Sequence, residues 1–218
     1  MFSNYEDVFI SNLDEFYQSD QKVLKGYKLK EKNFEMKPGE KPLVVNSIAI
    51  DKNDVIWISA NNGIFYYQKD PFIKKNKINY DQIYFKRLVT TNENNIDPAA
   101  MRPGFLLDPV HREMISGANQ DQVIIIDPDS LKYTILRMDF NGYNDRSVKF
   151  WYMTTDNNGD IWGQDLLYTY KITLTKNNNG EYTGARFKRY TAADGFPYQT
   201  YRLLCDHNNN IWLTVQGT

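Results

Sequence analysis

The sequence has little of what several classes of protein depend on. Of its 218 residues only Cys205 is a cysteine, so the chain can form neither an internal disulfide nor a zinc site made of several cysteines. The longest purely aliphatic run is residues 123–126, whereas a membrane-spanning helix needs about 20 apolar residues. We therefore expect no direct membrane insertion by this segment.

The sequence also lacks an excess of positive charge. It has 26 Lys and Arg against 27 Asp and Glu, for a formal net charge of -1. Nucleic-acid binders normally carry a basic surface that attracts phosphates, so we expect no nucleic-acid partner. Residues 1–7 include acidic side chains, where a secretory signal would have a basic and then an apolar stretch, and we expect no signal peptide there.

A repeated motif is the strongest feature that is present. The pattern D-x-x-x-x-I-W occurs three times, and a fourth copy keeps the aspartate but has Met114 in the place of tryptophan. The aspartates of the four copies are at 51, 108, 156 and 206, at intervals of 57, 48 and 50 residues. The repeat residues are Asp51, Trp57, Asp108, Asp156, Trp162, Asp206 and Trp212.

The repeat divides the chain into units of about 50 residues. A partial fifth copy is predicted at the start, because residues 8–11 resemble residues 56–59. We expect one region over residues 1–218, with units at 1–40 (partial), 41–95, 96–145, 146–195 and 196–218 (partial). Such a period is typical of repeat architectures rather than of a single compact domain.

Each unit reads as short β-strands joined by tight turns. An apolar run precedes the aspartate and a second one follows the turn. An aspartate at such a turn can accept hydrogen bonds from backbone amides about two residues on, and the Asn and Gly nearby tolerate positive φ. We expect almost no helix, and we expect exposed polar loops over residues 70–81, 90–100 and 176–184.

The apolar runs predict sheets that are covered on both faces. They are more continuous than the alternation of a sheet wetted on one side. Radially stacked, four-stranded antiparallel blades satisfy this, with one large aromatic side chain per blade between neighbouring sheets. We therefore predict an all-β fold of about four to five β-propeller blades, forming a partial or small propeller. Trp57, Trp162 and Trp212 are assigned to the space between sheets.

These residues resemble the two-component-regulator propeller repeat, which occurs in the sensor regions of hybrid two-component systems. Residues 45–67 are similar throughout, including Gly63 and Tyr67, and residues 156–162 match the turn. The resemblance implies a periplasmic ligand sensor, often for oligosaccharides, that is linked through a membrane segment to a histidine kinase. Since the chain begins inside one unit and ends inside another, we expect a piece of a longer sensor.

Residues that could carry chemistry are few. His111 and His207 are the only histidines, and each lies in a repeat turn where an exposed, structural role is expected. The stretch from Asp156 to Asp160 resembles a calcium loop, but Leu167 stands where a bidentate glutamate would be needed. We expect no metal, no cofactor and no catalytic residue. A propeller enzyme that acts on polysaccharide stays open as an alternative, because the acidic residues allow many carboxylate pairs.

Ligand binding at one end of the propeller is the leading functional hypothesis. Loops before the innermost strands and loops between second and third strands converge there. Aromatic rings beside Arg, Asn and Gln suit a glycan or another small ligand, although Trp151 and Tyr152 could instead belong to the core. Partners would be this ligand and either the rest of the sensor chain or a second copy in a dimer; a protein-interaction scaffold is a third reading. The candidate residues are Asn61, Asn62, Arg102, Trp151, Tyr152, Gln164, Asp165, Tyr198 and Arg202.

Overall fold

The computed structural model describes residues 9–11, 26–68, 82–90, 106–108, 110, 113–119, 122–138, 150–165, 167–197 and 200–215. The predicted all-β fold is confirmed over these residues: they form three four-stranded and two two-stranded antiparallel sheets. These residues include two short 3-10 helices, η1 (Glu31–Asn33) and η4 (Ala192–Asp194), and no α-helix.

Strands that follow one another in the sequence are neighbours in each four-stranded sheet. The first sheet contains β3 (Val45–Ile50), β4 (Ile56–Ala60), β5 (Gly63–Tyr67) and β6 (Lys86–Thr90). The second contains β7 (Leu106–Leu107), β8 (Met114–Asn119), β9 (Gln122–Asp127) and β10 (Lys132–Arg137). The third contains β11 (Tyr152–Thr155), β12 (Ile161–Gln164), β13 (Thr169–Lys176) and β14 (Tyr182–Tyr190).

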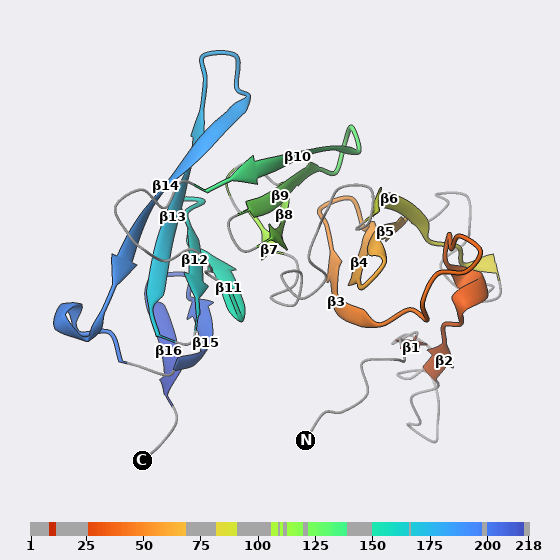
Figure 1. The fold of residues 1–218 in the computed structure, drawn as a ribbon, viewed down its shortest axis with the longest axis horizontal. Coiled ribbons are helices and arrows are strands. Elements are labelled where there is room, and N and C mark those ends of the chain that lie inside the picture. Colours follow the sequence, from red (N-terminus) through yellow and green to blue (C-terminus); the bar gives the residue numbers. More distant parts are fainter. Residues whose placement is uncertain are drawn as a thin grey trace.

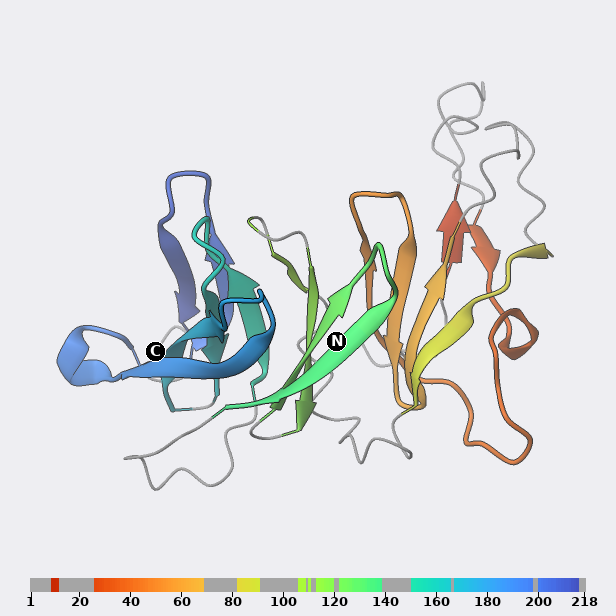
Figure 2. The same cartoon turned by 90° about the horizontal axis from the view of Figure 1, so that it is seen from above.

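Two smaller sheets lie at the ends of this series. One pairs β1 (Phe9–Ser11) with β2 (Gly26–Lys28), and the other pairs β15 (Thr200–Cys205) with β16 (Ile211–Val215). The sheets follow one another along an arc (Figure 1), and from above they stand side by side like the blades of a propeller (Figure 2). The two small sheets lie at opposite ends in both views, so the described sheets do not close into a ring.

The core lies between the sheets, as the continuous apolar runs predicted. Alternate side chains of a strand point to opposite faces, and in β9 both faces are buried. Ile124 and Ile126 pack in a cluster with Trp57 of the first sheet, whereas Ile125 packs in a second cluster with Ile161 of the third sheet. The second sheet is therefore covered on both sides by its neighbours.

The expected burial of the three motif tryptophans is confirmed for two of them and is wrong for the third. Trp57 is fully buried and Trp162 is only 9% exposed, in agreement with a place between sheets. Trp212 is 60% exposed, so the prediction that it is buried between sheets is wrong. The physical reason is the presence or absence of a neighbouring sheet. The face of β4 that carries Trp57 packs against β8 and β9, whereas none of the described sheets covers the corresponding face of β16.

The expected loop over residues 176–184 is also corrected. Strand β13 continues to Lys176 and β14 begins at Tyr182, so only residues 177–181 form the turn. The extension has a tertiary cause, because the Tyr182 hydroxyl donates a hydrogen bond to Glu113 of the second sheet. The other two expected loops, residues 70–81 and 90–100, lie outside the described residues except for Thr90.

Candidate ligand-binding site

The repeated turns occupy one end of the sheets, and their hydrogen bonds explain the motif. In the first turn Asp51 Oδ1 accepts the amides of Asn53 (2.8 Å) and Val55 (3.0 Å), and Asp51 Oδ2 accepts the Trp57 indole N–H (2.8 Å). The turns at Asp156 and Asp206 make the same three bonds, with indole distances of 2.9 and 2.8 Å. The aspartate and the tryptophan recur together because they are bonded to each other.

The fourth residue of each turn adopts a positive φ. Asp54, Gly159 and Asn209 have φ values of 60°, 82° and 65°, a region that Gly, Asn and Asp tolerate best. Adjacent turns then bond to one another, since the Asn157 amide donates to Asn209 Oδ1 at 2.8 Å. His207 is exposed in the last turn, and His111 lies outside the described residues. The turns at this end of the molecule therefore have a structural role, because they form contacts between neighbouring sheets.

The candidate ligand-binding residues belong to the opposite end. Because the strands are antiparallel, the starts of β3, β11 and β15 lie at the same end of their sheets as the β4–β5 and β12–β13 turns. Of the nine candidates, Arg102 and Tyr198 lie outside the described residues. The other seven divide into a group on the first sheet and a group around the third and last sheets.

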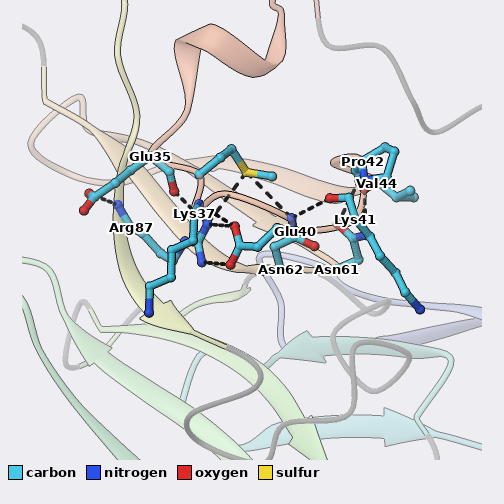
Figure 3. Close-up of polar contacts among 10 residues, drawn as sticks. Glu35, Lys37, Glu40, Lys41, Pro42, Val44, Asn61, Asn62 and Arg87 are labelled. Atoms are coloured by element: carbon cyan, nitrogen blue, oxygen red, sulfur yellow. Dashed lines mark hydrogen bonds and ion pairs between the residues drawn. The ribbon is translucent and has the colours of Figure 1, made fainter.

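On the first sheet, Asn61 and Asn62 are used by the protein itself (Figure 3). Asn61 accepts the Val44 amide and donates to the Pro42 carbonyl, both at 2.9 Å. Asn62 donates to the Lys41 carbonyl at 3.0 Å. Both amide side chains therefore hold residues 35–44, which we call the strap, against the β4–β5 turn.

An ion pair fixes the same strap to β6. Arg87 donates to both carboxylate oxygens of Glu40, at 2.6 and 2.5 Å, and to the Glu35 carbonyl at 2.7 Å. The Arg87 guanidinium also lies 5.1 Å from the centre of the Phe65 ring, and its side chain is 5% exposed. The hydrogen bonds from Arg87 lower the pKa of Glu40 to about 2. These contacts leave the first sheet with a structural role at this end.

The third sheet presents a different surface at the same end. Trp151 is 43% exposed, while its backbone N–H is held by the Gln164 carbonyl at 2.8 Å. Just before it, Phe150 is buried against Gly163, where an added Cβ would lie 2.6 Å from the Phe150 ring. Anchoring of Phe150 leaves the next side chain, Trp151, pointing outward, so the alternative that Trp151 belongs to the core is wrong.

The remaining candidates at this end differ in exposure and in role. Gln164 is 2% exposed and lies directly opposite the half-buried Tyr152 in the β11–β12 ladder. Asp165 accepts the amides of Leu167 and Tyr168, each at 2.7 Å, so it shapes the turn. Arg202 is exposed on β15, which contacts β11.

Three further residues belong to this edge and were missed: Leu167, Tyr168 and Arg189. The Arg189 guanidinium lies 4.4 Å from the centre of the Tyr168 ring, at the point where β14 ends and β13 begins. The exposed Leu167 lies next to Tyr168 in the β12–β13 turn. An aromatic residue at a strand start and an arginine at the end of the paired strand were visible in the sequence, but only the strand register joins them. We call Trp151, Leu167, Tyr168 and Arg189 the aromatic edge.

A buried polar pair elsewhere in the fold is structural. Tyr182 donates to Glu113 of the second sheet, and Lys176 Nζ lies 3.8 Å from the other Glu113 oxygen. Burial and the Glu113 carboxylate raise the pKa of Tyr182, so its hydroxyl stays protonated as a donor. The pair links two sheets and offers no activated nucleophile.

The described residues contain no group of three or more His, Cys, Asp or Glu side chains that could hold a metal ion. Within the same part of the chain, no helix is long and apolar enough to cross a membrane.

Three solved structures with a similar fold are distant in sequence. The extracellular domain of a protein assigned as a hybrid two-component system from B. thetaiotaomicron matches 90% of this chain and 22% of its own, with 14% identity and a TM-score of 0.55. A protein from Lactobacillus plantarum matches 98% of this chain and 59% of its own, with 8% identity and a TM-score of 0.57. Catalytically inactive virginiamycin B lyase from Staphylococcus aureus, with quinupristin, matches 90% and 54%, with 14% identity and a TM-score of 0.50.

These similarities place the chain in the β-propeller fold class, and the predicted fold class is confirmed. The chain spans 22–59% of the lengths of the three proteins. No family model and no curated protein matches the sequence. The similar structures include both the extracellular domain of a protein assigned as a hybrid two-component system and a lyase, so the fold by itself assigns no activity.

Proposed function

We propose that this chain is a ligand-sensing segment of a two-component signalling sensor that binds an oligosaccharide without turning it over. Its place of action would be the periplasm, as the resemblance of its repeat implies. The ligand would lie on the aromatic edge of the third sheet, next to Tyr152 and Arg202 of the neighbouring strands.

The exposed Trp151 carries this proposal. Trp57 and Trp162 are held inside the fold, whereas Trp151 is 43% exposed although its backbone is fixed on both sides, by Gln164 and by the buried Phe150. An exposed indole on a fixed backbone suits the C–H face of a sugar ring. The Arg189 guanidinium, 4.4 Å from the centre of the Tyr168 ring, adds a positive charge at the same edge.

The proposed site lies away from the strap. Because Asn61 and Asn62 already bond to Val44, Pro42 and Lys41, we expect them to contribute to stability rather than to ligand contact. The fold likeness to the extracellular domain of a protein assigned as a hybrid two-component system agrees with a sensing role, at a coverage of 22% of that protein.

A thermal-shift screen against a panel of oligosaccharides, followed by calorimetric titration of each hit, tests the proposal. A ligand that binds only the folded state raises Tm in proportion to its concentration above Kd. Trp151→Ala should abolish the shift. Because 43% of Trp151 is exposed, its ligand-free Tm should fall by less than it does when a fully buried tryptophan is removed.

Tyr84→Ala is the matched control, since Tyr84 is an equally exposed aromatic residue, 48%, outside the aromatic edge. It should keep the full ligand response. Loss of binding in both variants, or retention in both, contradicts the site. Release of shortened glycan during the titration would contradict the non-catalytic part and favour a polysaccharide-acting enzyme.

A further inference from the structure

The strap is held against the first sheet mainly by polar contacts. None of residues 35–44 is buried, and none lies in a strand or a helix. Met36 and Leu43 are only partly buried against the core, whereas Phe65 in the sheet is fully buried. Local opening of a folded chain costs least where few apolar side chains are buried. We therefore expect the strap to open at a lower cost than the sheet.

Arg87 of β6 holds the strap at two points (Figure 3). Its guanidinium donates to both carboxylate oxygens of Glu40, and its Nη2 also donates to the Glu35 carbonyl. Its backbone N–H donates to Glu35 Oε2 at 2.9 Å. Within the strap, the Lys37 amide donates to Glu40 Oε2 at 2.8 Å, so the same carboxylate also fixes the bend between the two points. Separation of Glu40 from Arg87 would therefore loosen residues 35–40.

The surroundings of Arg87 form a carboxylate site. The Arg87 side chain is 5% exposed, and its guanidinium lies 5.1 Å from the centre of the Phe65 ring in a cation–π contact. Two parallel N–H···O bonds to one carboxylate are the geometry for which arginine is best suited. The group that fills this site is the Glu40 side chain, which belongs to the irregular strap and is 14% exposed. A carboxylate of another molecule would make the same two bonds once Glu40 has moved away.

We propose that the strap is an autoinhibitory latch, in which Glu40 occupies a carboxylate-binding site at Arg87 that otherwise takes a uronic acid residue of an acidic oligosaccharide. The inference rests on the proposed function in taking the ligand to be a saccharide, but the site is separate from the aromatic edge. Because the ligand and Glu40 compete for one guanidinium, the apparent association constant is reduced to the fraction of molecules with an open strap. Asn61 and Asn62 help to hold the strap closed through residues 41–44.

The first experiment compares the wild type with Glu40→Gln. The probe is an oligomer of galacturonic acid, and its methyl ester is the neutral counterpart. Glutamine keeps the size of Glu40 but loses the charge-assisted pair, so more molecules have an open strap. In calorimetric titration of the full chain, the acidic probe should bind Glu40→Gln at least about tenfold more tightly than the wild type, while the ester should show no difference between the two proteins.

A matched control lies just outside the strap. Glu31→Gln removes the charge of an exposed glutamate, and this variant should bind the acidic probe as the wild type does. Equal affinity of the wild type and Glu40→Gln for the acidic probe overturns the latch. An equal gain in Glu31→Gln would mean that general charge repulsion is responsible, which also overturns it.

Arg87→Lys in the Glu40→Gln background tests the site itself. Lysine keeps the positive charge but cannot make two parallel bonds to one carboxylate. The affinity for the acidic probe should therefore fall by about tenfold or more relative to Glu40→Gln alone. Unchanged affinity would show that the probe binds elsewhere and overturns the carboxylate site. A melting curve without probe checks that the double variant is folded, and if it is not, the comparison of Glu40→Gln with the wild type decides.

Hydrogen exchange tests whether the probe opens the strap. In the closed strap the Lys37 amide donates to Glu40 Oε2 at 2.8 Å. The Val44 amide donates to Asn61 Oδ1 at 2.9 Å. Saturating acidic probe should speed the exchange of both amides by about tenfold or more, while residues 56–60 of β4 should exchange as before. Unchanged or slower exchange of the two amides with the probe bound overturns the latch.

Failure of the latch and failure of the proposed function give different results. If neutral oligosaccharides bind and Trp151→Ala abolishes their binding, while Glu40→Gln changes no affinity, then the proposed function stands and the latch is overturned. If no oligosaccharide, acidic or neutral, binds to the wild type or to Glu40→Gln, both are overturned.

Discussion

The first and last copies of the repeated turn have the same local structure in opposite surroundings. Asp51 holds Trp57 and Asp206 holds Trp212 through indole hydrogen bonds of 2.8 Å each. Yet Trp57 is fully buried and Trp212 is 60% exposed. The comparison teaches that the motif determines the turn and the direction of the indole, while burial depends on whether another sheet lies against that face.

Removal of the two indoles should have the most unequal effect. Trp57→Ala should lower the free energy of unfolding by about 3–5 kcal/mol, the usual cost of emptying a buried aromatic site. Trp212→Ala should cost less than about 1 kcal/mol, as surface substitutions do. Urea denaturation of both variants measures this, and equal losses would contradict the structural difference between the two turns.

Breaking only the indole hydrogen bond should give a smaller contrast. In Asp51→Asn the side-chain amide can still accept the backbone N–H groups, but it cannot also accept the Trp57 indole N–H. A buried donor without its acceptor costs about 1–3 kcal/mol. In the corresponding Asp206→Asn the released Trp212 indole N–H can bond to water, so this substitution should cost less than Asp51→Asn. The same denaturation experiment compares them, and a larger loss at position 206 would show that the turn matters more than its burial.

The second copy of the repeat lacks the tryptophan, so it can be tested by adding one. Met114 stands in the tryptophan position, is fully buried and packs in one cluster with Trp57. Met114→Trp restores the motif beside Asp108, but it adds volume to a closed space, so we expect a loss of about 1–3 kcal/mol. Met114→Leu is the control and should stay within about 1.5 kcal/mol of wild type. Stabilisation by the tryptophan would mean that the space between the first two sheets is not filled.

The distinction between the local structure of the turn and the burial of its indole explains which features could be predicted from the sequence. The fold followed from local signals, because the bond from Asp51 to Trp57 spans one turn and residues 123–126 require cover on both faces. The outcome at Trp212 and Trp151 could not be predicted, since exposure depends on what packs against them. The blade boundaries and the ligand contacts stay predictions.

The contacts of the strap could not be predicted from the sequence either, because they join segments that are distant in the chain. Asn61 and Asn62 lie where a ligand contact was expected, but their partners are carbonyl and amide groups of residues 41–44. Nothing in the spacing of Glu40 and Arg87 indicates that they pair, since they come from segments that only the folded sheet brings together. The length of β13 was missed because the contact from Tyr182 to Glu113 joins two sheets.

The smallest expected effect is the loss of stability at the last turn when the pH is lowered. Hydrogen bonds from the Asn210 and Trp212 side chains lower the pKa of Asp206 from 3.8 to about 2. A carboxyl whose folded pKa is depressed contributes its stability above the unfolded value, and this contribution is lost as the pH falls toward the folded value. The wild type should therefore be more stable than Asp206→Asn at pH 6, and the difference should narrow between about pH 4 and pH 2. Melting curves of the two proteins across this range measure the change. A difference that is constant with pH would mean that the ionised Asp206 carboxylate does not stabilise the turn.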